Sequence, residues 1–218
     1  MHCHTYYSPD CLVSPRELIE TARKRGLERV AVTDHNAIGG ALAAARLAPD
    51  LIIVGEEIKT TEGELLGYFL TEEVPAGLSP NETILRLRRQ GAVISVAHPF
   101  DRKRSGSWAP QALAQILPQV DAVEIFNARA LTPAPNDQAA EAARLAELPG
   151  TAGSDAHSAG ELGQALFMLA AFTNADEFRQ ALASGEVQGK LSTPWVHARS
   201  RWAVLRKATG WRRPADGE

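Results

Sequence analysis

Five of the six histidines in this 218-residue chain fall at or just after segments that we expect to be β-strands. They are His2, His4, His35, His98 and His157. Carboxylates lie near most of them in the sequence, namely Asp10, Asp34, Glu56, Glu57 and Asp155. A lone histidine at a strand end is usually a hydrogen-bonded structural residue, and Asp34-His35 alone could form a turn. Because histidine and carboxylate recur together, we interpret the set as one shared metal site.

Two short spacings support this interpretation. In an extended segment, His2 and His4 point to the same face, about 6 to 7 Å apart, so two imidazole nitrogens can bind one ion. Asp155 and His157 repeat the spacing with a mixed pair. Nitrogen and oxygen donors suit Zn, Mn or Fe, whereas two cysteines, Cys3 and Cys11, are too few for a thiolate cluster. Cys3 would point to the face opposite the two histidines, and we interpret it as structural.

Alternating short apolar runs and amphipathic stretches must position these side chains. The predicted strands are Val30–Asp34, Leu51–Glu56, Leu65–Leu70, Ala92–His98, Ala122–Phe126, Thr151–Asp155 and Ala165–Phe172. Helices are expected to begin at the capping sequences Ser14-Pro15, Ser79-Pro80 and Asn174-Ala175, and to cover Ile38–Ala48, Pro110–Leu117 and Pro135–Glu147. The pattern predicts an α/β protein with a largely parallel sheet, and both an open doubly wound sheet and a distorted barrel fit it. Functional groups in such folds gather at the carboxyl ends of the strands.

Composition sets further limits. Hydrophobic residues make up 44% of the chain and the net charge is −3, which are ordinary values for a globular protein. No apolar run reaches the roughly 18 residues of a membrane span, and the start does not resemble a signal peptide. We therefore expect a cytoplasmic protein that does not associate with membranes. We expect one domain over residues 1–197 and a basic tail over 198–218, which contains Trp202, Trp211 and six Lys or Arg residues.

Five segments, taken in order, resemble the PHP (polymerase and histidinol phosphatase) family of metal-dependent phosphoesterases. They are His2-Cys3-His4-Thr5-Tyr6-Tyr7-Ser8-Pro9-Asp10, Thr33-Asp34-His35-Asn36, Gly55-Glu56-Glu57-Ile58, Ala97-His98-Pro99-Phe100 and Gly153-Ser154-Asp155-Ala156-His157. The resemblance implies a distorted (β/α)7 barrel with two to three divalent ions (Mn, Fe or Zn) at the carboxyl ends of its strands. It also implies a ligand set: His2, His4, Glu57 and Asp155 for one ion, Glu57 and His98 for a second, and Asp10, His35 and His157 for a third.

The chain departs from the family pattern at two places. Members of the family often carry another histidine about ten residues after the bridging glutamate, where this chain has Glu64. Glu64 could bind metal through oxygen, or it could be an exposed glutamate of a hairpin. His2 directly follows the initiator methionine, so either the first strand is shortened or the assigned start is late.

These residues predict hydrolysis of a small phosphorylated molecule, such as a nucleotide, by a metal-activated water. From the resemblance we expect Asp10, His35, Glu57 and His157 to be catalytic. Arg102 and Arg129 follow strand ends and could bind phosphate, or they could be ordinary surface arginines. One alternative is an exonuclease that acts on short oligonucleotides, with the basic tail contacting the phosphate backbone. The other is a metal-binding regulatory module without catalysis.

Overall fold

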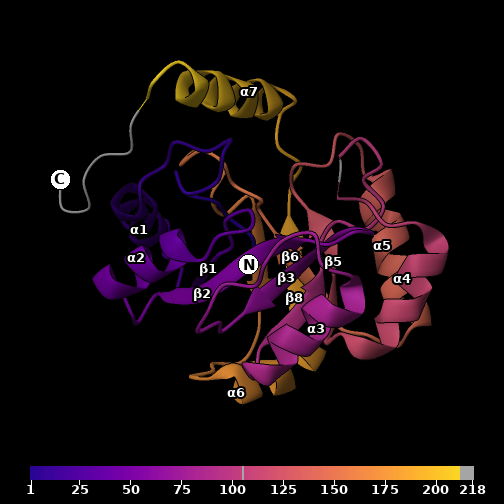
Figure 1. Cartoon of the computed structure of the whole chain (residues 1–218). Helices are drawn as coiled ribbons and strands as arrows, with labels where there is room; N and C mark the ends of the chain where they lie inside the picture. Colours follow the sequence, from indigo (N-terminus) through magenta and orange to yellow (C-terminus); the bar gives the residue numbers. More distant parts are fainter. Residues whose placement is uncertain (105, 212–218) are drawn as a thin grey trace.

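We describe a computed structural model of the chain, covering residues 1–104 and 106–211 (Figure 1). Its helices are α1 (Pro15–Lys24), α2 (Gly39–Leu47), α3 (Pro80–Arg89), α4 (Pro110–Ile116), α5 (Ala134–Leu145), α6 (Ala175–Ala181) and α7 (Trp195–Ala208). Its strands are β1 (Val30–Val32), β2 (Ile52–Lys59), β3 (Glu64–Tyr68), β4 (Val93–Val96), β5 (Ala122–Asn127), β6 (Gly150–Gly153), β7 (Ala165–Met168) and β8 (Glu186–Gly189). The predicted α/β class is confirmed.

The main sheet has six strands in the order β1-β2-β3-β4-β5-β6, and it curls between helices on its outer side (Figure 1). Strands β7 and β8 form a separate antiparallel pair. Apolar side chains of the central strands, including Leu65, Ile94 and Val96, are fully buried and form the core with α3 and α4. The closure into seven strands that the resemblance implies stays a prediction.

Strand β3 runs antiparallel to both β2 and β4, whereas the pairs β1–β2, β4–β5 and β5–β6 are parallel, so the sheet is largely parallel as expected, with an exception at this strand. The reason is the short connection over residues 60–63, which is a turn and cannot cross over the sheet. The Thr60 hydroxyl accepts hydrogen bonds from the amides of Glu62 and Gly63, both at 3.1 Å. This turn pairs Lys59 with Glu64 and buries the side chain of Glu64.

The first residues of the chain lie between the ends of β1 and β6. The amide of Thr33, just after β1, donates to the carbonyl of Cys3 at 2.8 Å. On the other side, Asp155 N donates to His2 O at 2.7 Å and His4 N donates to Ala156 O at 2.9 Å. The segment therefore connects the two outer strands of the main sheet.

Three helices begin as the sequence predicts. The side chains of Ser14, Ser79 and Asn174 accept hydrogen bonds from the amides of Glu17, Glu82 and Glu177 respectively. Each cap satisfies an amide that the first helical turn leaves without a partner. These caps confirm the predicted starts of α1, α3 and α6, and so fix where the loops that enter these helices end.

Helix α7 lies across the end of the molecule that carries the loops after the strands (Figure 1). Arg129, after β5, donates to Ser200 of this helix at 2.9 Å, and Lys207 donates to the carbonyls of Tyr6 and Ser8. The expected boundary after residue 197 falls inside α7, and residues 212–218 of the expected tail lie outside the described residues. Among the described residues, no helix combines the length and apolar character needed to cross a membrane.

Candidate metal centre

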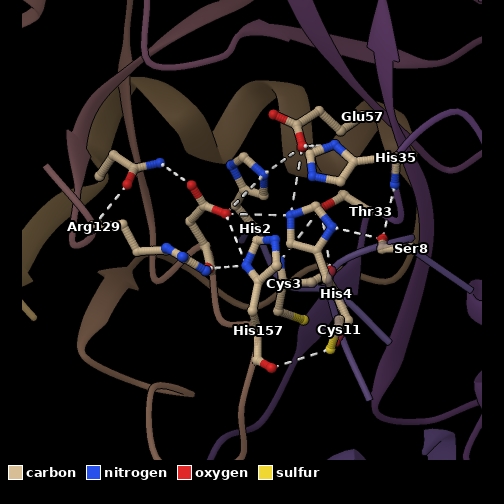
Figure 2. A network of polar contacts seen from close by, with 12 residues as sticks. His2, Cys3, His4, Ser8, Cys11, Thr33, His35, Glu57, Arg129 and His157 are labelled. Carbon is tan, nitrogen blue, oxygen red and sulfur yellow. Dashed lines mark hydrogen bonds and ion pairs between the residues drawn. The ribbon is translucent and has the colours of Figure 1, made fainter. Parts of the chain in front are cut away.

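Nine side chains predicted as metal ligands converge at one end of the sheet. Figure 2 labels His2, His4, His35, Glu57 and His157 among them. His2 and His4 come from the N-terminal segment, Asp10 from the loop after it, and His35 from the loop after β1. Glu57 and Glu64 lie on β2 and β3. His98 follows β4, and Asp155 and His157 follow β6. His2 and His157 are far apart in the sequence, but they lie close together in space because the N-terminal segment pairs with residues 155 and 156.

The best-defined group contains His2, His4, Glu57 and Asp155. Glu57 Oε2 lies 3.2 Å from His2 Nε2 and 3.4 Å from His4 Nε2. Asp155 Oδ1 lies 3.7 Å from His2 Nε2 and 3.2 Å from His4 Nε2. All four of these atoms are buried and have no hydrogen-bond partner among the described residues. Ligands about 2.1 Å from a tetrahedral ion stand roughly 3.4 Å apart, so these residues fit a divalent metal.

Glu57 connects this group to its neighbours. Its Oε2 atom is also 2.8 Å from His35 Nδ1, whereas Oε1 is 2.9 Å from His98 Nε2. The two oxygens of one carboxylate therefore face two different sets of imidazoles. Glu64 lies beside this second set, with its Oε2 atom 3.7 Å from His98 Nε2. Glu64 is buried, which contradicts the alternative of an exposed hairpin residue.

A third group forms where the centre meets solvent. Asp10 Oδ2 is 3.0 Å from His157 Nε2, and Asp10 Oδ1 is 3.7 Å from His35 Nε2. The Asp10 side chain is 24% exposed and that of His35 is 18% exposed. The side chains of the first group are fully buried. The centre therefore opens on the side of Asp10 and His35.

The electrostatic balance at the centre favours cations. Burial alone would lower the pKa of His2, yet the carboxylates of Glu57, Asp155 and Glu124 raise it to about 10. Burial and the charge of Glu57 raise the pKa of Glu64. Both shifts have the same origin, an excess of carboxylates in a buried space, and a bound divalent ion would offset that excess.

Glu124 and Asn127, which the sequence analysis missed, orient the first group. Glu124 on β5 accepts hydrogen bonds from His2 Nδ1 at 2.9 Å and from the backbone amide of His98 at 2.9 Å. Asn127 Nδ2 donates to Asp155 Oδ2 at 3.0 Å and to Glu124 Oε2 at 3.1 Å. Such contacts hold a ligating imidazole in one tautomer and one orientation. The signal was present in the sequence, as a charged residue inside the apolar run Ala122–Phe126.

Asp34 supports two of the imidazoles indirectly, through Ser8. It accepts hydrogen bonds from the Thr5 amide at 2.6 Å and from the Ser8 hydroxyl at 2.7 Å. Ser8 Oγ in turn lies 3.0 Å from His4 Nδ1 and accepts from the His35 amide at 3.0 Å (Figure 2). Asp34 therefore fixes two imidazoles through one hydroxyl, which agrees with a supporting role and not with metal binding.

The backbone is strained at two of the proposed ligands. His98 has a φ of 23° and Asp155 has a φ of 50°, in the left-handed backbone region that residues other than glycine rarely adopt. Strain of this kind persists only where the surroundings impose it, and it concentrates at functional sites. Here the amides of both residues are held, His98 by Glu124 and Asp155 by the carbonyl of His2.

The arginines are arranged differently from the sequence expectation. The Arg102 side chain is exposed, and no contact between it and the cluster is found among the described residues. Arg129 is buried, and its guanidinium contacts the carbonyls of Asp155 and Val196, the Ser200 hydroxyl and Glu161. Arg104 belongs to the same basic loop as Arg102, in a segment whose sequence suggests binding of an anionic substrate, and it reaches Asp155 Oδ2. A substrate-binding role for Arg102 or Arg129 stays a prediction.

Known proteins resemble this chain in both sequence and fold. The PHP domain family matches residues 1–96, and the PHP-associated family matches residues 133–187. An uncharacterised protein of Methanocaldococcus jannaschii is 38% identical over 143 residues, which are 59% of this chain and 80% of that protein. A proposed metal-dependent phosphoesterase of Bifidobacterium adolescentis superposes with a TM-score of 0.63 at 20% identity, over 83% of this chain and 94% of its own. A two-domain protein of Bacteroides vulgatus with a predicted PHP-like metal-dependent phosphoesterase superposes with a TM-score of 0.70 at 18% identity, over 93% of this chain and 68% of its own.

Proposed function

The chain belongs to the PHP domain family, and on that premise we propose that it hydrolyses a small phosphorylated molecule in a metal-dependent reaction. One observation carries this proposal. Four buried donor atoms of His2, His4, Glu57 and Asp155 stand 3.2 to 3.7 Å apart and lack hydrogen-bond partners among the described residues. Leaving buried polar atoms without partners is costly, so a cluster of them implies a ligand that they bind together.

His2, His4, Glu57 and Asp155 would hold one ion, with Glu57 and His98 beside a second and Asp10, His35 and His157 around a third. The mixed nitrogen and oxygen donors suit Mn, Fe or Zn. When bound, such ions supply positive charge that polarises a phosphoryl group and lowers the pKa of a water molecule.

The chain's own residues orient the reactants and handle the proton. Asp10 and His35 line the open side of the centre, so a phosphate enters past them. The attacking water forms a bond to phosphorus as the bond to the ester oxygen breaks, and the departing alcohol must gain a proton. Asp10 lies at the mouth, and its Oδ1 atom has no hydrogen-bond partner among the described residues, so it can accept the proton of the water and return it to the oxygen of the departing alcohol. Glu124 and Asn127 keep His2 and Asp155 in place throughout.

The same family membership suggests how the sheet is completed. We propose that residues 2–4 are the seventh strand of a distorted barrel, shortened to a few residues. Their hydrogen bonds to residue 33 on one side and to residues 155 and 156 on the other support this assignment.

Metal analysis and a panel of phosphoesters test the proposed function. The purified protein should contain two to three equivalents of transition metal and hydrolyse at least one small phosphoester when Mn²⁺ is supplied. His35→Ala and Asp155→Ala should abolish turnover while circular dichroism shows an intact fold, and Asp50→Ala, an exposed acid, serves as the control. A metal-free protein with full activity, or unchanged kinetics in both variants, would contradict the mechanism. Bound metal without turnover of any ester would favour a regulatory module.

A second candidate substrate is a short oligonucleotide. The outer face of α7 exposes Trp195 (77%) and Trp202 (57%), with Arg199 and Arg206 at helical spacings from them. Exposed aromatic rings between arginines are typical of surfaces that stack bases and contact phosphates. Under this alternative, Trp195→Ala with Trp202→Ala should weaken cleavage of an oligonucleotide and leave hydrolysis of a nucleoside 3′,5′-bisphosphate unchanged. Point variants are preferable to deletion because Lys207 of the same helix holds the loop of Tyr6 and Ser8.

A further inference from the structure

Arg104 is placed differently from the basic residues next to it in the sequence. Arg102 and Lys103 are exposed, whereas the Arg104 side chain is only 19% exposed and its Nη1 atom donates to Asp155 Oδ2. The segment lies between β4 and α4, and it contacts the metal centre through the ion pair of Arg104 with Asp155. A guanidinium that loses most of its hydration at such a place needs a compensating anion.

Asp155 supplies only part of that compensation. Its Oδ2 atom accepts from Arg104 and from Asn127 Nδ2, while Oδ1 faces His2 and His4. The charges of Glu57 and Glu64 also act on Arg104, because together with Asp155 they raise its pKa. Its other nitrogens are not among the buried atoms without partners, and the side chain as a whole keeps part of its surface exposed.

The other candidate arginine has no such freedom. The guanidinium of Arg129 is 3% exposed and is directed at the Asp155 carbonyl, Glu161, and the Val196 carbonyl and Ser200 hydroxyl of α7. These contacts connect the segment after β6 to α7 and direct both terminal nitrogens of Arg129 at the protein itself, which leaves only the buried Nε atom without a partner among the described residues.

We propose that Arg104 binds the phosphoryl oxygens of the substrate, anchored at one nitrogen by Asp155 and donating from the others. A planar guanidinium can donate two parallel hydrogen bonds to a phosphate, which a lysine at the same place cannot. The inference rests on the proposed phosphoesterase function and names the group that recognises the anion. It also gives Asp155 two tasks, because one of its oxygens faces the ligand cluster and the other orients Arg104.

Inorganic phosphate is the probe, titrated calorimetrically into the Mn²⁺-saturated protein with the metal content of each sample measured. Arg104→Gln retains an amide that can donate to Asp155 but loses the charge. We expect the Kd for phosphate to rise about 10- to 100-fold in this variant, with unchanged metal content. Arg104→Lys should recover only part of the affinity, and added guanidinium should partly restore turnover in Arg104→Ala. Lys103→Ala is the matched control and should bind phosphate normally.

Three results would overturn the inference. The first is normal phosphate affinity in Arg104→Gln, and the second is a loss in Arg102→Ala that exceeds the loss in Arg104→Gln. The third is loss of metal from Arg104→Gln at a Mn²⁺ concentration that saturates the wild type, because Arg104 would then position the ligand Asp155 and not the substrate. If the metal-loaded wild type neither binds phosphate nor hydrolyses any ester, the proposed function itself fails, which is a separate outcome.

Discussion

Replacing Glu124 with glutamine should weaken metal binding although Glu124 is not a ligand. In the native chain, Glu124 Oε1 lies 2.9 Å from His2 Nδ1, so that nitrogen keeps its proton, and Nε2, which faces Glu57 and Asp155, is the nitrogen that gives up its proton when it binds a metal ion. The other oxygen, Oε2, accepts from the His98 amide and from Asn127. These two donors would hold the glutamine carbonyl at the Oε2 position, which places the amide NH₂ against His2 Nδ1.

That arrangement reverses which of the two ring nitrogens of His2 must carry the proton. The NH₂ group donates, so Nδ1 must accept and the proton moves to Nε2, where it blocks ligation. Substitutions behind a ligating histidine typically reduce metal affinity about 10- to 100-fold, which corresponds to roughly 1.4 to 2.7 kcal/mol. Competition against a chelator of known Mn²⁺ or Zn²⁺ affinity measures the change, and NMR of the histidine ring nitrogens reports the tautomer directly.

Glu56→Gln is the matched control. Glu56 is the neighbour of Glu57 on β2 and is equally buried, but its Oε2 atom accepts from the Val74 amide at 3.0 Å, and no contact with a proposed ligand is found among the described residues. Burial raises the pKa of Glu56 to about 8, so the native side chain is largely neutral at pH 7 and glutamine resembles it. If Glu124→Gln folds and keeps metal affinity within about twofold of wild type, or if both variants lose it equally, the tautomer argument is refuted.

Three further predictions follow from other contacts. Removing metal by chelation should lower the unfolding temperature by roughly 5 to 10 °C relative to protein in metal at 100 times its Kd, because binding to the folded state alone adds about 2.7 kcal/mol; calorimetry with and without chelator checks this. Gly106→Ala should lower metal stoichiometry as much as Glu64→Gln does, because an added methyl group would overlap the Glu64 carboxylate; elemental analysis of both variants decides, with Gly160→Ala, where a methyl group meets only ordinary van der Waals contacts, as a control. Lys207→Ala should speed proteolytic cleavage within α7, because the bonds to the Tyr6 and Ser8 carbonyls are lost, whereas Arg206→Ala on the same helix should not.

Most helices and strands could be predicted because the signals that specify them lie within a few neighbouring residues. Continuous apolar runs indicated the strands β1 to β7, and serine or asparagine caps gave the starts of three helices. Strand β8 was missed because Glu186–Gly189 is short, polar and mostly exposed, so no hydrophobic pattern distinguishes it. The direction of β3 was missed because it depends on the length of one turn and not on the strand's own residues.

Within the candidate site, too, some residues could be predicted from local patterns and others could not. His35 and Asp155 could be placed because they follow strands, and the ends of neighbouring strands converge. Arg104 could not be placed, since the conformation of the loop after β4 decides which of several basic residues enters the centre. Ser8 gave no signal either, because a hydroxyl becomes important only when Asp34 and His4 are brought to it from separate segments.

The pairing of the first residues with the end of β6 has a consequence for the order of events during synthesis. His2 and His4 leave the ribosome long before their backbone partners at residues 155 and 156. Until then, two imidazoles without Asp155 make an incomplete chelate. The first metal group can therefore assemble only once β6 has emerged, so a growing chain cannot bind the ion in its final coordination. A metal ion held by all four residues of this group would thus be acquired late in the maturation of this protein.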